Sequence, residues 1–271
     1  MTSDIHAAGN PPGPTAGFTK RSIDLNADVG EIPAALADGS EARLLALVSS
    51  ANIACGGHAG DAETMAAVLA LCRQLGVVVG AHPSYPDREH FGRLPMSITS
   101  ARLAAAVASQ VGALMDIATA QGVVVRHIKP HGALYNVAVK DQAVATAIGR
   151  GLDAWRDRIV LIGLAGSEML TTWRRAGFRV AGEAFADRRY EPDGSLRSRE
   201  HTDALILDPA TAAQQAIAIA VQHRVRSVTG ATIDVTAETL CLHGDTPNAV
   251  ALAHAIRQAL ENHGVAIRPV E

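Results

Sequence analysis

The sequence is poor in aromatic residues and in cysteine, and each shortage excludes a class of protein. Aromatic residues make up 3% of the chain and hydrophobic residues 48%, so aliphatic side chains must fill the core. Such a core is typical of helices packed on a parallel sheet. Cys55, Cys72 and Cys241 form no CxxC pair, which argues against a disulfide framework and favours a reducing, cytoplasmic compartment.

Positive charge and targeting segments are also scarce. The formal net charge is -3 at pH 7, with neither a basic stripe nor an aromatic platform, so a nucleic acid partner is not expected. No apolar run looks long enough to span a bilayer, so no membrane association is expected. Residues 1–20 lack the apolar segment of a signal peptide, and their Pro and Gly content predicts a disordered tail. Residues 21–271 are expected to form a single domain, because no shift in composition divides them.

Common nucleotide-binding and hydrolase motifs are missing from the sequence. It contains no GxxxxGK[ST] loop, no GxGxxG after a strand, no GxSxG and no HExxH. If a nucleotide binds, a P-loop does not hold it.

What the sequence does contain is an alternation of short apolar segments and helical patterns, which predicts parallel βα units. Strands are predicted at residues 22–28, 51–54, 77–81, 122–125, 159–163, 178–182 and 239–242, with a small strand or hairpin at 227–235. Helices are predicted at residues 41–50, 61–75, 99–121, 141–151, 167–176 and 209–222, and a last one with Thr246 as N-cap and Pro247 at its first position.

Polar residues follow nearly every predicted strand. A closed barrel gathers all these strand ends at one mouth, whereas an open sheet needs functional residues only beside its switch point. The pattern therefore favours an α/β fold, a TIM-like (β/α) barrel of about seven parallel strands. The long polar segment 189–208, which carries a turn signal at Pro192-Asp193-Gly194, is a candidate lid.

The first predicted strand carries Asp24, Asn26 and Asp28 on one face, because side chains alternate along a strand. Three polar groups on an otherwise buried strand are costly unless they are paired or line a cavity. They form either a metal or general-base cluster or a set of buried hydrogen-bonding groups that hold the barrel.

The central stretch of the chain, residues 126–136, places His127 and Lys129 on one face of a strand end. Lys129 is expected either to clamp a substrate carboxylate or phosphate, or to form a structural ion pair with Asp24 or Glu183. Asp187 and Arg188 are expected at the same mouth, since they follow another strand.

Five of the eleven histidines follow predicted strands, which makes at least one general acid, general base or ligand an expected feature of the mouth. Cys55 is either a thiolate nucleophile or, more commonly for such a position, a small buried side chain. The five histidines are His58, His82, His127, His131 and His243.

Six separated motifs resemble those of one known family over nearly the whole chain after residue 20. They are DLNADVGE (24–31), ANIACGGHAGD (51–61), GAHPSYPD (80–87) with FGR (91–93), KPHGALYN (129–136), EAFADRRY (183–190) with DGSLRSR (193–199), and LHGDTP (242–247). In this order they resemble the LamB/YcsF family. Gly57, where many members carry Phe, and Leu94 after the FGR motif are small departures.

The resemblance implies a barrel related to the glycoside hydrolase/deacetylase superfamily. It implies a subunit of an ATP-dependent 5-oxoprolinase, which opens 5-oxo-L-proline to L-glutamate with two partner subunits, B and C. ATP with Mg²⁺ is the implied co-substrate. ATP can phosphorylate the lactam oxygen, which makes the ring carbon electrophilic toward water.

Such a site needs cations for phosphates and a substrate carboxylate, together with a base and an acid. Lys129, Arg188 and Arg93 are the candidate cations, and Asp28, His58 and His131 are the candidate base and acid. The predicted catalytic residues are Asp28, His58, Lys129 and His131, and the predicted substrate- or nucleotide-binding residues are Asp24, Asn26, His82, Arg93, His127, Glu183, Asp187, Arg188, His243 and Asp245.

A bound metal stays an open question at this stage. Deacetylases of the superfamily use an Asp after the first strand and two histidines, which Asp28 and His58 match in part, but Val29 stands where a second Asp often follows. One alternative function is therefore a metal-dependent deacetylase or amidohydrolase that acts alone. Another is a non-catalytic subunit that binds a small acid. The sequence leaves open which subunit holds the lactam and which holds ATP.

Overall fold

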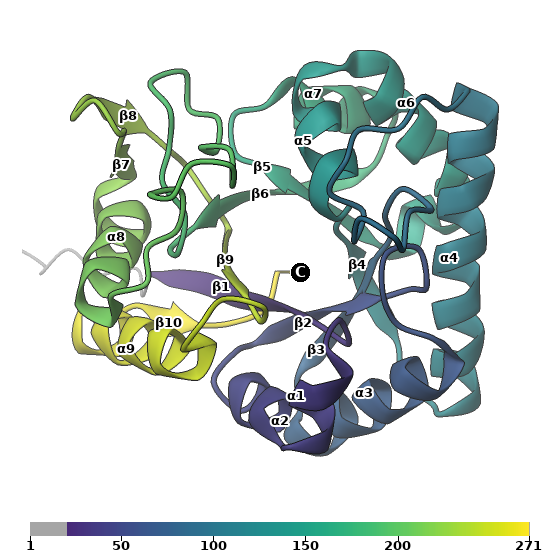
Figure 1. Cartoon of the computed structure of the whole chain (residues 1–271), viewed down its shortest axis with the longest axis horizontal. Coiled ribbons are helices and arrows are strands. Elements are labelled where there is room, and N and C mark those ends of the chain that lie inside the picture. The colour runs from purple at the N-terminus through teal and green to yellow at the C-terminus, as the bar shows by residue number, and fades with distance from the viewer. Residues whose placement is uncertain (1–20, 271) are drawn as a thin grey trace, which may run out of the picture.

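Seven parallel strands form a closed barrel in the computed structural model, which describes residues 21–270 (Figure 1). Strand β9 pairs with both β6 and β1, so the sheet closes on itself and the predicted barrel is confirmed. The seven strands are β1 (Ser22–Val29), β2 (Ser50–Ala54), β3 (Val78–His82), β4 (Val125–Ile128), β5 (Val160–Leu164), β6 (Arg179–Phe185) and β9 (Thr239–His243).

Helices surround the ring of strands (Figure 1). They are α1 (Pro33–Ala37), α2 (Ser40–Leu45), α3 (Ala62–Leu75), α4 (Ser100–Ala120), α5 (Gly132–Lys140), α6 (Gln142–Gly151), α7 (Glu168–Arg175), α8 (Pro209–Gln222) and α9 (Ala249–Asn262), with a 3-10 helix η1 (Asp153–Arg158). Strand β10 (Ala266–Ile267) extends the sheet beside the start of β1. The predicted hairpin exists as β7 (Arg224–Arg226) and β8 (Thr232–Asp234), which pair antiparallel.

The alternation predicted for β1 separates an apolar face from a polar one. Leu25, Ala27 and Val29 are buried in the core shared with the helices. Asp24 and Asn26 make hydrogen bonds to residues of β2, β6 and β9 across the inside of the barrel. A buried aliphatic side chain of this size stabilises the fold by about 1.5–3 kcal/mol, so the outer layer supplies the stability that the polar interior does not.

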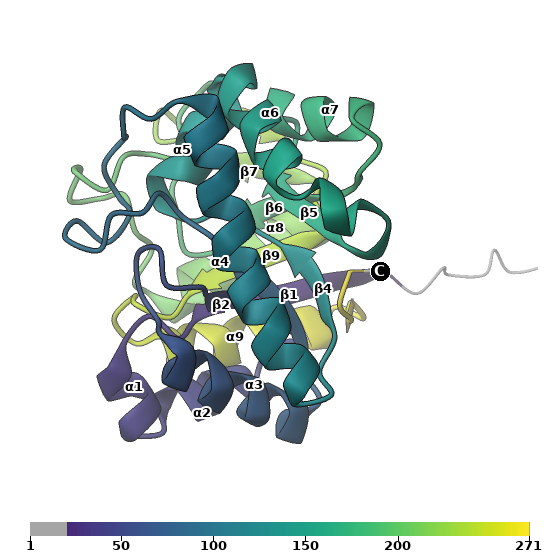
Figure 2. The same cartoon turned by 90° about the vertical axis from the view of Figure 1, so that its right-hand side faces the viewer.

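Helix α4 is long and apolar enough to cross a membrane by length and composition alone, which the sequence pattern did not predict. It lies along the outside of the barrel (Figure 2). Leu103, Val107, Val111 and Leu114 recur at helical spacing and are fully buried. This apolar face packs in the core of the barrel, which accounts for the composition of the helix.

The bounds predicted for the central strand were wrong. Strand β4 runs from Val125 to Ile128, whereas the prediction had it end at residue 125. Val124 is 58% exposed, so the β-branched run that suggested a buried strand begins on the surface. His127 therefore lies within the strand, and Lys129 is the first residue after it.

The starts of two helices also differ from the prediction. Thr246 does not cap the last helix: α9 begins at Ala249 after Asn248, whose φ of 63° is left-handed, and the hydroxyl of Thr246 instead points to Asp187. Helix α5 was not predicted at all, because the glycine and proline of the central stretch suggested a loop up to Asp141. The predicted tail of residues 1–20 lies outside the described residues, and the division of the chain into domains stays a prediction.

Candidate active site

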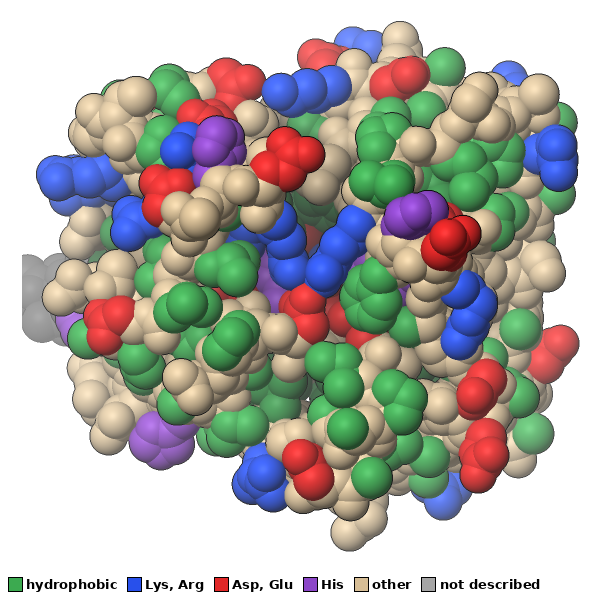
Figure 3. Space-filling view, viewed as in Figure 1, with side chains coloured by type: hydrophobic (Ala, Val, Ile, Leu, Met, Phe, Trp, Pro, Cys, Tyr) green, Lys and Arg blue, Asp and Glu red, His purple; other side chains and the backbone are tan. Residues whose placement is uncertain are grey.

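The carboxyl ends of the barrel strands surround a cavity of about 610 Å³. Side chains from β1, β4, β6 and β9, from the segments that follow β3 and β4, and from residues 195–200 line it. Figure 3 shows Lys and Arg side chains gathered around a hollow in the middle of this face, with acidic side chains beside them. The mouth is therefore the part of the described chain that best fits an anionic ligand.

Lys129 stands at the floor of this cavity with only 2% of its surface exposed. Its Nζ lies 2.9 Å from Asp28 Oδ1, 2.9 Å from Glu183 Oε1 and 2.9 Å from Cys241 Sγ. Burial alone would lower the pKa of Lys129, but Asp28, Cys241 and Glu183 together hold that pKa well above its usual range. Burial likewise opposes ionisation of Asp28, yet His82 and Lys129 hold its pKa well below the usual range.

A layer of amides beneath Lys129 fixes the two carboxylates. Asn52 Nδ2 donates to Asp28 Oδ1 at 2.8 Å and to Asn26 Oδ1 at 2.7 Å. Asn26 Nδ2 in turn donates to Glu183 Oε1 at 3.1 Å, and His127 Nε2 lies 2.9 Å from Asn52 Oδ1. Asn26, His127 and Glu183 thus lie beneath the cavity and do not line it.

Asp24 lies still deeper and does not pair with Lys129, so that half of the predicted ion-pair alternative was wrong. Ser50, Ser49 and Thr239 donate to its carboxylate at 2.5–2.7 Å. Burial raises the pKa of Asp24 despite these hydrogen bonds. Among the described residues its contacts are those of a structural group that joins β1, β2 and β9 at the inside of the barrel.

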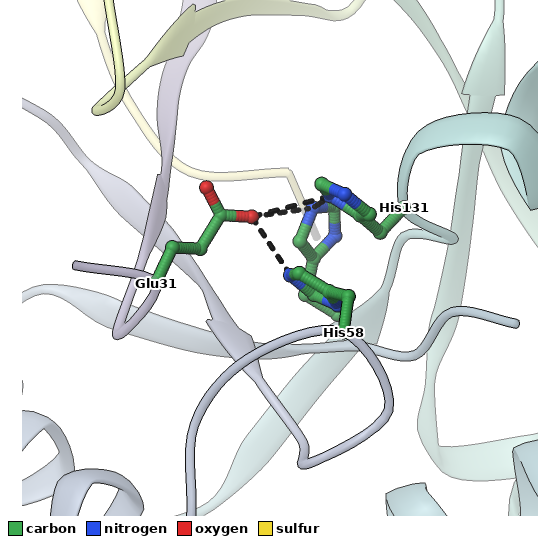
Figure 4. Close-up of side chains that lie close together, drawn as sticks. Glu31, His58 and His131 are labelled. Carbon is green, nitrogen blue, oxygen red and sulfur yellow. Dashed lines mark hydrogen bonds and ion pairs between the residues drawn. The ribbon is translucent and has the colours of Figure 1, made fainter. Parts of the chain in front are cut away.

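A second cluster joins Glu31 to three histidines at the mouth (Figure 4). Glu31 Oε1 lies 2.9 Å from His58 Nε2, 3.2 Å from His131 Nδ1 and 3.8 Å from His82 Nε2. His82 Nε2 also lies 3.0 Å from His131 Nδ1 and 3.3 Å from Asp28 Oδ2, so the two clusters touch. The rings of His58 and His131 stack with centroids 3.6 Å apart.

Backbone carbonyls anchor two of these imidazoles from behind. His82 Nδ1 lies 2.7 Å from the carbonyl oxygen of Lys129, and His131 Nε2 lies 3.0 Å from that of Phe91. Metal-bound histidines are commonly held this way, with the second ring nitrogen on a carbonyl. The donor set of one carboxylate and three imidazoles fits a transition metal such as Zn²⁺.

A second group of potential ligands, Asp28, Cys241 and His243, fits a metal poorly. The ammonium of Lys129 lies 2.9 Å from both Asp28 Oδ1 and Cys241 Sγ, where it would repel a cation. Only the glutamate and histidine cluster is therefore a candidate metal centre among the described residues.

Burial sets the protonation of the histidines in different directions. It lowers the pKa of His58 to about 4 and also lowers that of His131. Burial acts on His82 in the same sense, but the charge of Asp28 outweighs it and raises the pKa. At neutral pH the site thus holds neutral imidazoles at His58 and His131, which can accept a proton, beside an ionised pair of His82 and Asp28.

Arginines from two distant segments meet at the rim. Arg93, from the segment after β3, and Arg199, from the long segment after β6, both pair with Asp245, and the second pair measures 2.9 Å. Deeper in the rim, His243 Nδ1 lies 2.9 Å from Asp187 Oδ2, and Arg188 lines the cavity. The predicted residues after β3, β6 and β9 are therefore brought together.

A smaller cavity of about 230 Å³ adjoins the site, and Asp28 borders both cavities. Glu41 lines the smaller cavity and accepts a hydrogen bond from the backbone N–H of Gly30 at 3.0 Å. Burial raises the pKa of Glu41 to about 7, so this carboxyl is half protonated near neutral pH.

The sequence prediction missed several residues of the site. Glu31 holds the histidine cluster together, yet it follows a strand just as the predicted residues do, and that position was the available signal. Asn52 has an equally simple signal, since it is a polar residue in the middle of the buried strand β2. Cys241 and Arg199 had none, because a lone cysteine in an apolar strand and an arginine in a polar segment are common.

The site can now be set beside known proteins. A family model described as the LamB/YcsF family matches residues 23–271. A relative named as the A subunit of 5-oxoprolinase, from Chloroflexus aggregans, is 49% identical over 247 residues, which cover 91% of this chain and 98% of the relative. The relative of the same name from Chloroflexus aurantiacus is 48% identical over the same shares.

Among solved structures, the crystal structure of a lactam utilization protein from Thermus thermophilus superposes with a TM-score of 0.85 at 40% sequence identity. The match covers 92% of this chain and 100% of that one. The family suggested by the six motifs is thereby confirmed, and this chain belongs to the LamB/YcsF family.

Proposed function

We propose that this chain is a subunit of an ATP-dependent 5-oxoprolinase, a hydrolase that opens the ring of 5-oxo-L-proline to give L-glutamate. The names of its relatives support a role in 5-oxoproline or lactam metabolism. The observation that carries the proposal is the buried Lys129 and Asp28 pair beside two neutral histidines, at the floor of a cavity with a cationic rim.

The reaction consumes one ATP and two waters. The lactam oxygen attacks the γ-phosphorus of ATP, and ADP leaves. Water then adds to the ring carbon and loses a proton, the ring nitrogen takes up a proton, and the ring C–N bond breaks to leave an acyl phosphate. A second water hydrolyses the acyl phosphate to glutamate and phosphate.

The side chains at the mouth match these steps. His131 and His58 are neutral imidazoles that can take the proton of an attacking water, a role typically worth about 10²- to 10⁴-fold in rate. Lys129 carries a fixed positive charge where the lactam oxygen gains negative charge. Arg93 and Arg199 at the rim are placed to meet phosphate oxygens carried by Mg²⁺-ATP.

The proposal includes two partner subunits, B and C, because the name of the relatives identifies them as one component of a larger enzyme. It also includes a cytoplasmic location, in keeping with three cysteines that are free and buried. Reconstitution tests the function: the purified chain is mixed with both partners, and glutamate release from 5-oxo-L-proline is measured with ATP and Mg²⁺.

We expect release only when all three subunits and ATP are present. A complex that stays fully active when His131→Ala and Lys129→Ala variants replace the wild-type chain would overturn the catalytic role of this mouth. It would instead favour a subunit that binds a small acid without catalysis.

A second candidate function is a metal-dependent amidohydrolase or deacetylase that acts alone, and the Glu31 and histidine cluster favours it. Those side chains would hold the metal, which when bound supplies a Lewis acid beside Asp28. Titration of the chelator-treated chain with Zn²⁺ tests this reading by calorimetry. One tight site per chain, lost in His58→Ala but kept in His254→Ala on α9, together with hydrolysis that needs no ATP, would support it.

A further inference from the structure

Almost every cation around the large cavity already has a carboxylate partner. Lys129 is paired within the barrel, and the rim arginines share Asp245. Two cations of the long segment and of α5 pair with acidic residues nearby. The pairs are Lys129 with Asp28 and Glu183, Arg93 and Arg199 with Asp245, Arg197 with Glu191 and Asp203, and Lys140 with Asp193.

Arg188 is the exception among the described residues that line this cavity. It is 5% exposed, and no carboxylate oxygen of residues 21–270 lies within 4.0 Å of its guanidinium. It donates one hydrogen bond, to the backbone carbonyl of Arg197 at 2.6 Å, and its Nε has no partner. Burial, reinforced by the nearby charge of Arg199, lowers the pKa of Arg188 to about 10.

A buried guanidinium without a counter-ion is unfavourable, because burial removes its hydration and nothing replaces it. Arginine presents N–H groups in a planar fork that matches a carboxylate. The residue therefore fits an anionic group that arrives with a ligand, and the cavity that it lines gives that ligand access.

The walls beside Arg188 suit a small ring. Phe185, Leu164 and Tyr135 line the same cavity and offer apolar surface. Lys129 Nζ lies 5.5 Å from the centroid of the Phe185 ring, so a group that rests on this ring is within reach of the buried ammonium. A flat ring with a carboxylate on one side and a polar oxygen on the other matches this arrangement of one free cation, an aromatic wall and a second cation.

We propose that Arg188 binds the carboxylate of a small cyclic lactam acid, whose ring lies against Phe185 and whose lactam oxygen points toward Lys129. This chain, and not a partner, would then hold the lactam. The identity of that acid as 5-oxo-L-proline rests on the function proposed above, whereas the recognition of its carboxylate rests on the geometry of Arg188.

Binding measured by calorimetry without ATP tests this inference. The full chain is titrated with 5-oxo-L-proline and with 2-pyrrolidinone, which has the same ring but no carboxylate. We expect wild type to prefer 5-oxo-L-proline by about 10- to 100-fold, since hydrogen bonds to charged groups have that strength. Arg188→Gln should remove this preference and leave 2-pyrrolidinone binding within about 3-fold of wild type.

Lys140→Gln is the matched control, because it removes a positive charge that lines the same cavity but is 65% exposed and paired with Asp193. We expect it to keep the preference within about 2-fold, as a screened surface charge should. If Lys140→Gln and Arg188→Gln weakened 5-oxo-L-proline equally, general attraction and not a specific contact would explain binding, and the inference would be wrong.

Other outcomes also contradict it. They are no binding of either lactam by the wild-type chain, an unchanged preference in Arg188→Gln, or a loss confined to inorganic phosphate or ATP, which would assign Arg188 to the phosphates. Thermal unfolding checks that Arg188→Gln is folded. If it is not, Arg188→Lys replaces it and should lose about 5- to 10-fold of the preference, since it keeps the charge but not the fork.

The readout separates this inference from the proposed function. If the assembled complex releases no glutamate but Arg188→Gln still loses carboxylate binding, only the proposed function fails. If glutamate is released and the KM for 5-oxo-L-proline is unchanged in Arg188→Gln, only the role of Arg188 fails.

Discussion

Lys129 shows at the scale of one residue how a buried charge can serve both fold and chemistry. Its ammonium sits among Asp28, Glu183 and Cys241 inside a barrel that leaves these groups almost no exposure to water. A buried ion pair adds little net stability, but the loss of one partner leaves the other charge stranded. The residue therefore gains most of its value from what it presents to the cavity.

Lys129→Met should accordingly destabilise the chain by about 3–5 kcal/mol, because Asp28 and Glu183 lose their common counter-ion. Urea unfolding measures the change. Adding Glu183→Gln should recover at least about 1 kcal/mol, since contacting residues couple by this amount. An additive double variant would argue that the two groups do not interact in solution.

Glu41 gives a prediction with a defined pH window. Burial raises the pKa of its carboxyl in the folded chain to about 7, from an ordinary value of 4.5. Between these values the folded state binds more protons than the unfolded state, so its contribution to stability is full below pH 4.5 and is lost as the pH rises through 7.

Glu41→Gln stays neutral and keeps an oxygen for the N–H of Gly30. Relative to wild type, the variant should gain up to about 3 kcal/mol of stability between pH 5 and pH 8. Thermal unfolding at the two pH values measures this gain. A variant that lost stability relative to wild type at the higher pH would contradict the raised pKa.

At the scale of elements, the approach of β3 to β4 decides where the polar interior can form. Gly80 lies opposite His127 in the sheet register, and a Cβ at Gly80 would stand 2.1 Å from atoms of the imidazole. That imidazole is held by Asn52, so it cannot move aside freely. A glycine is therefore required at this point of β3.

Gly80→Ala should destabilise the chain by about 1–3 kcal/mol through overpacking. Gly112→Ala on α4 is its control, because the nearest atom to an added Cβ lies 4.0 Å away. Replacing a helix-interior glycine should there stabilise the chain by about 0.5–1 kcal/mol. Guanidinium chloride unfolding compares the two, and equal effects would argue against a close contact at His127.

The elements also show what the sequence could predict and where it could not. The order of strands followed from apolar periodicity, and Asp61 caps α3 as its side chain suggested. Thr246 misled because a tertiary contact took its hydroxyl away from the helix. The start of β4 misled because Val124 is β-branched but exposed, and exposure is not encoded in the local pattern.

At the scale of the whole molecule, closure of the barrel brings residues far apart in the chain into one site. Polar strand ends predicted this gathering, and His82, Lys129, His131 and His243 do line one cavity. The depth of each residue could not be predicted. Asp24, Asn26 and His127 share a face with the functional groups, but the barrel interior places them below the cavity, where they hold other side chains.

Contacts between loops were equally beyond a sequence reading. Arg93 and Asp245 are separated by more than half of the chain, and only the closed barrel brings them together at the rim. The same holds for Glu31, whose importance depends on three histidines that arrive from other strand ends. Charge pairing across the mouth is a property of the assembled barrel, and it is what leaves Arg188 without a carboxylate partner among the described residues.

The most direct test of the account is the joint production of ADP and glutamate from 5-oxo-L-proline by the three-subunit complex, with wild-type chain and with Asp28→Asn. We predict one ADP for each glutamate with wild type, and a loss of both products by at least about 100-fold with the variant, because loss of the carboxylate leaves Lys129 and His82 without their shared counter-ion. Equal glutamate release in the absence of ATP, or an Asp28→Asn complex as active as wild type, would contradict the account.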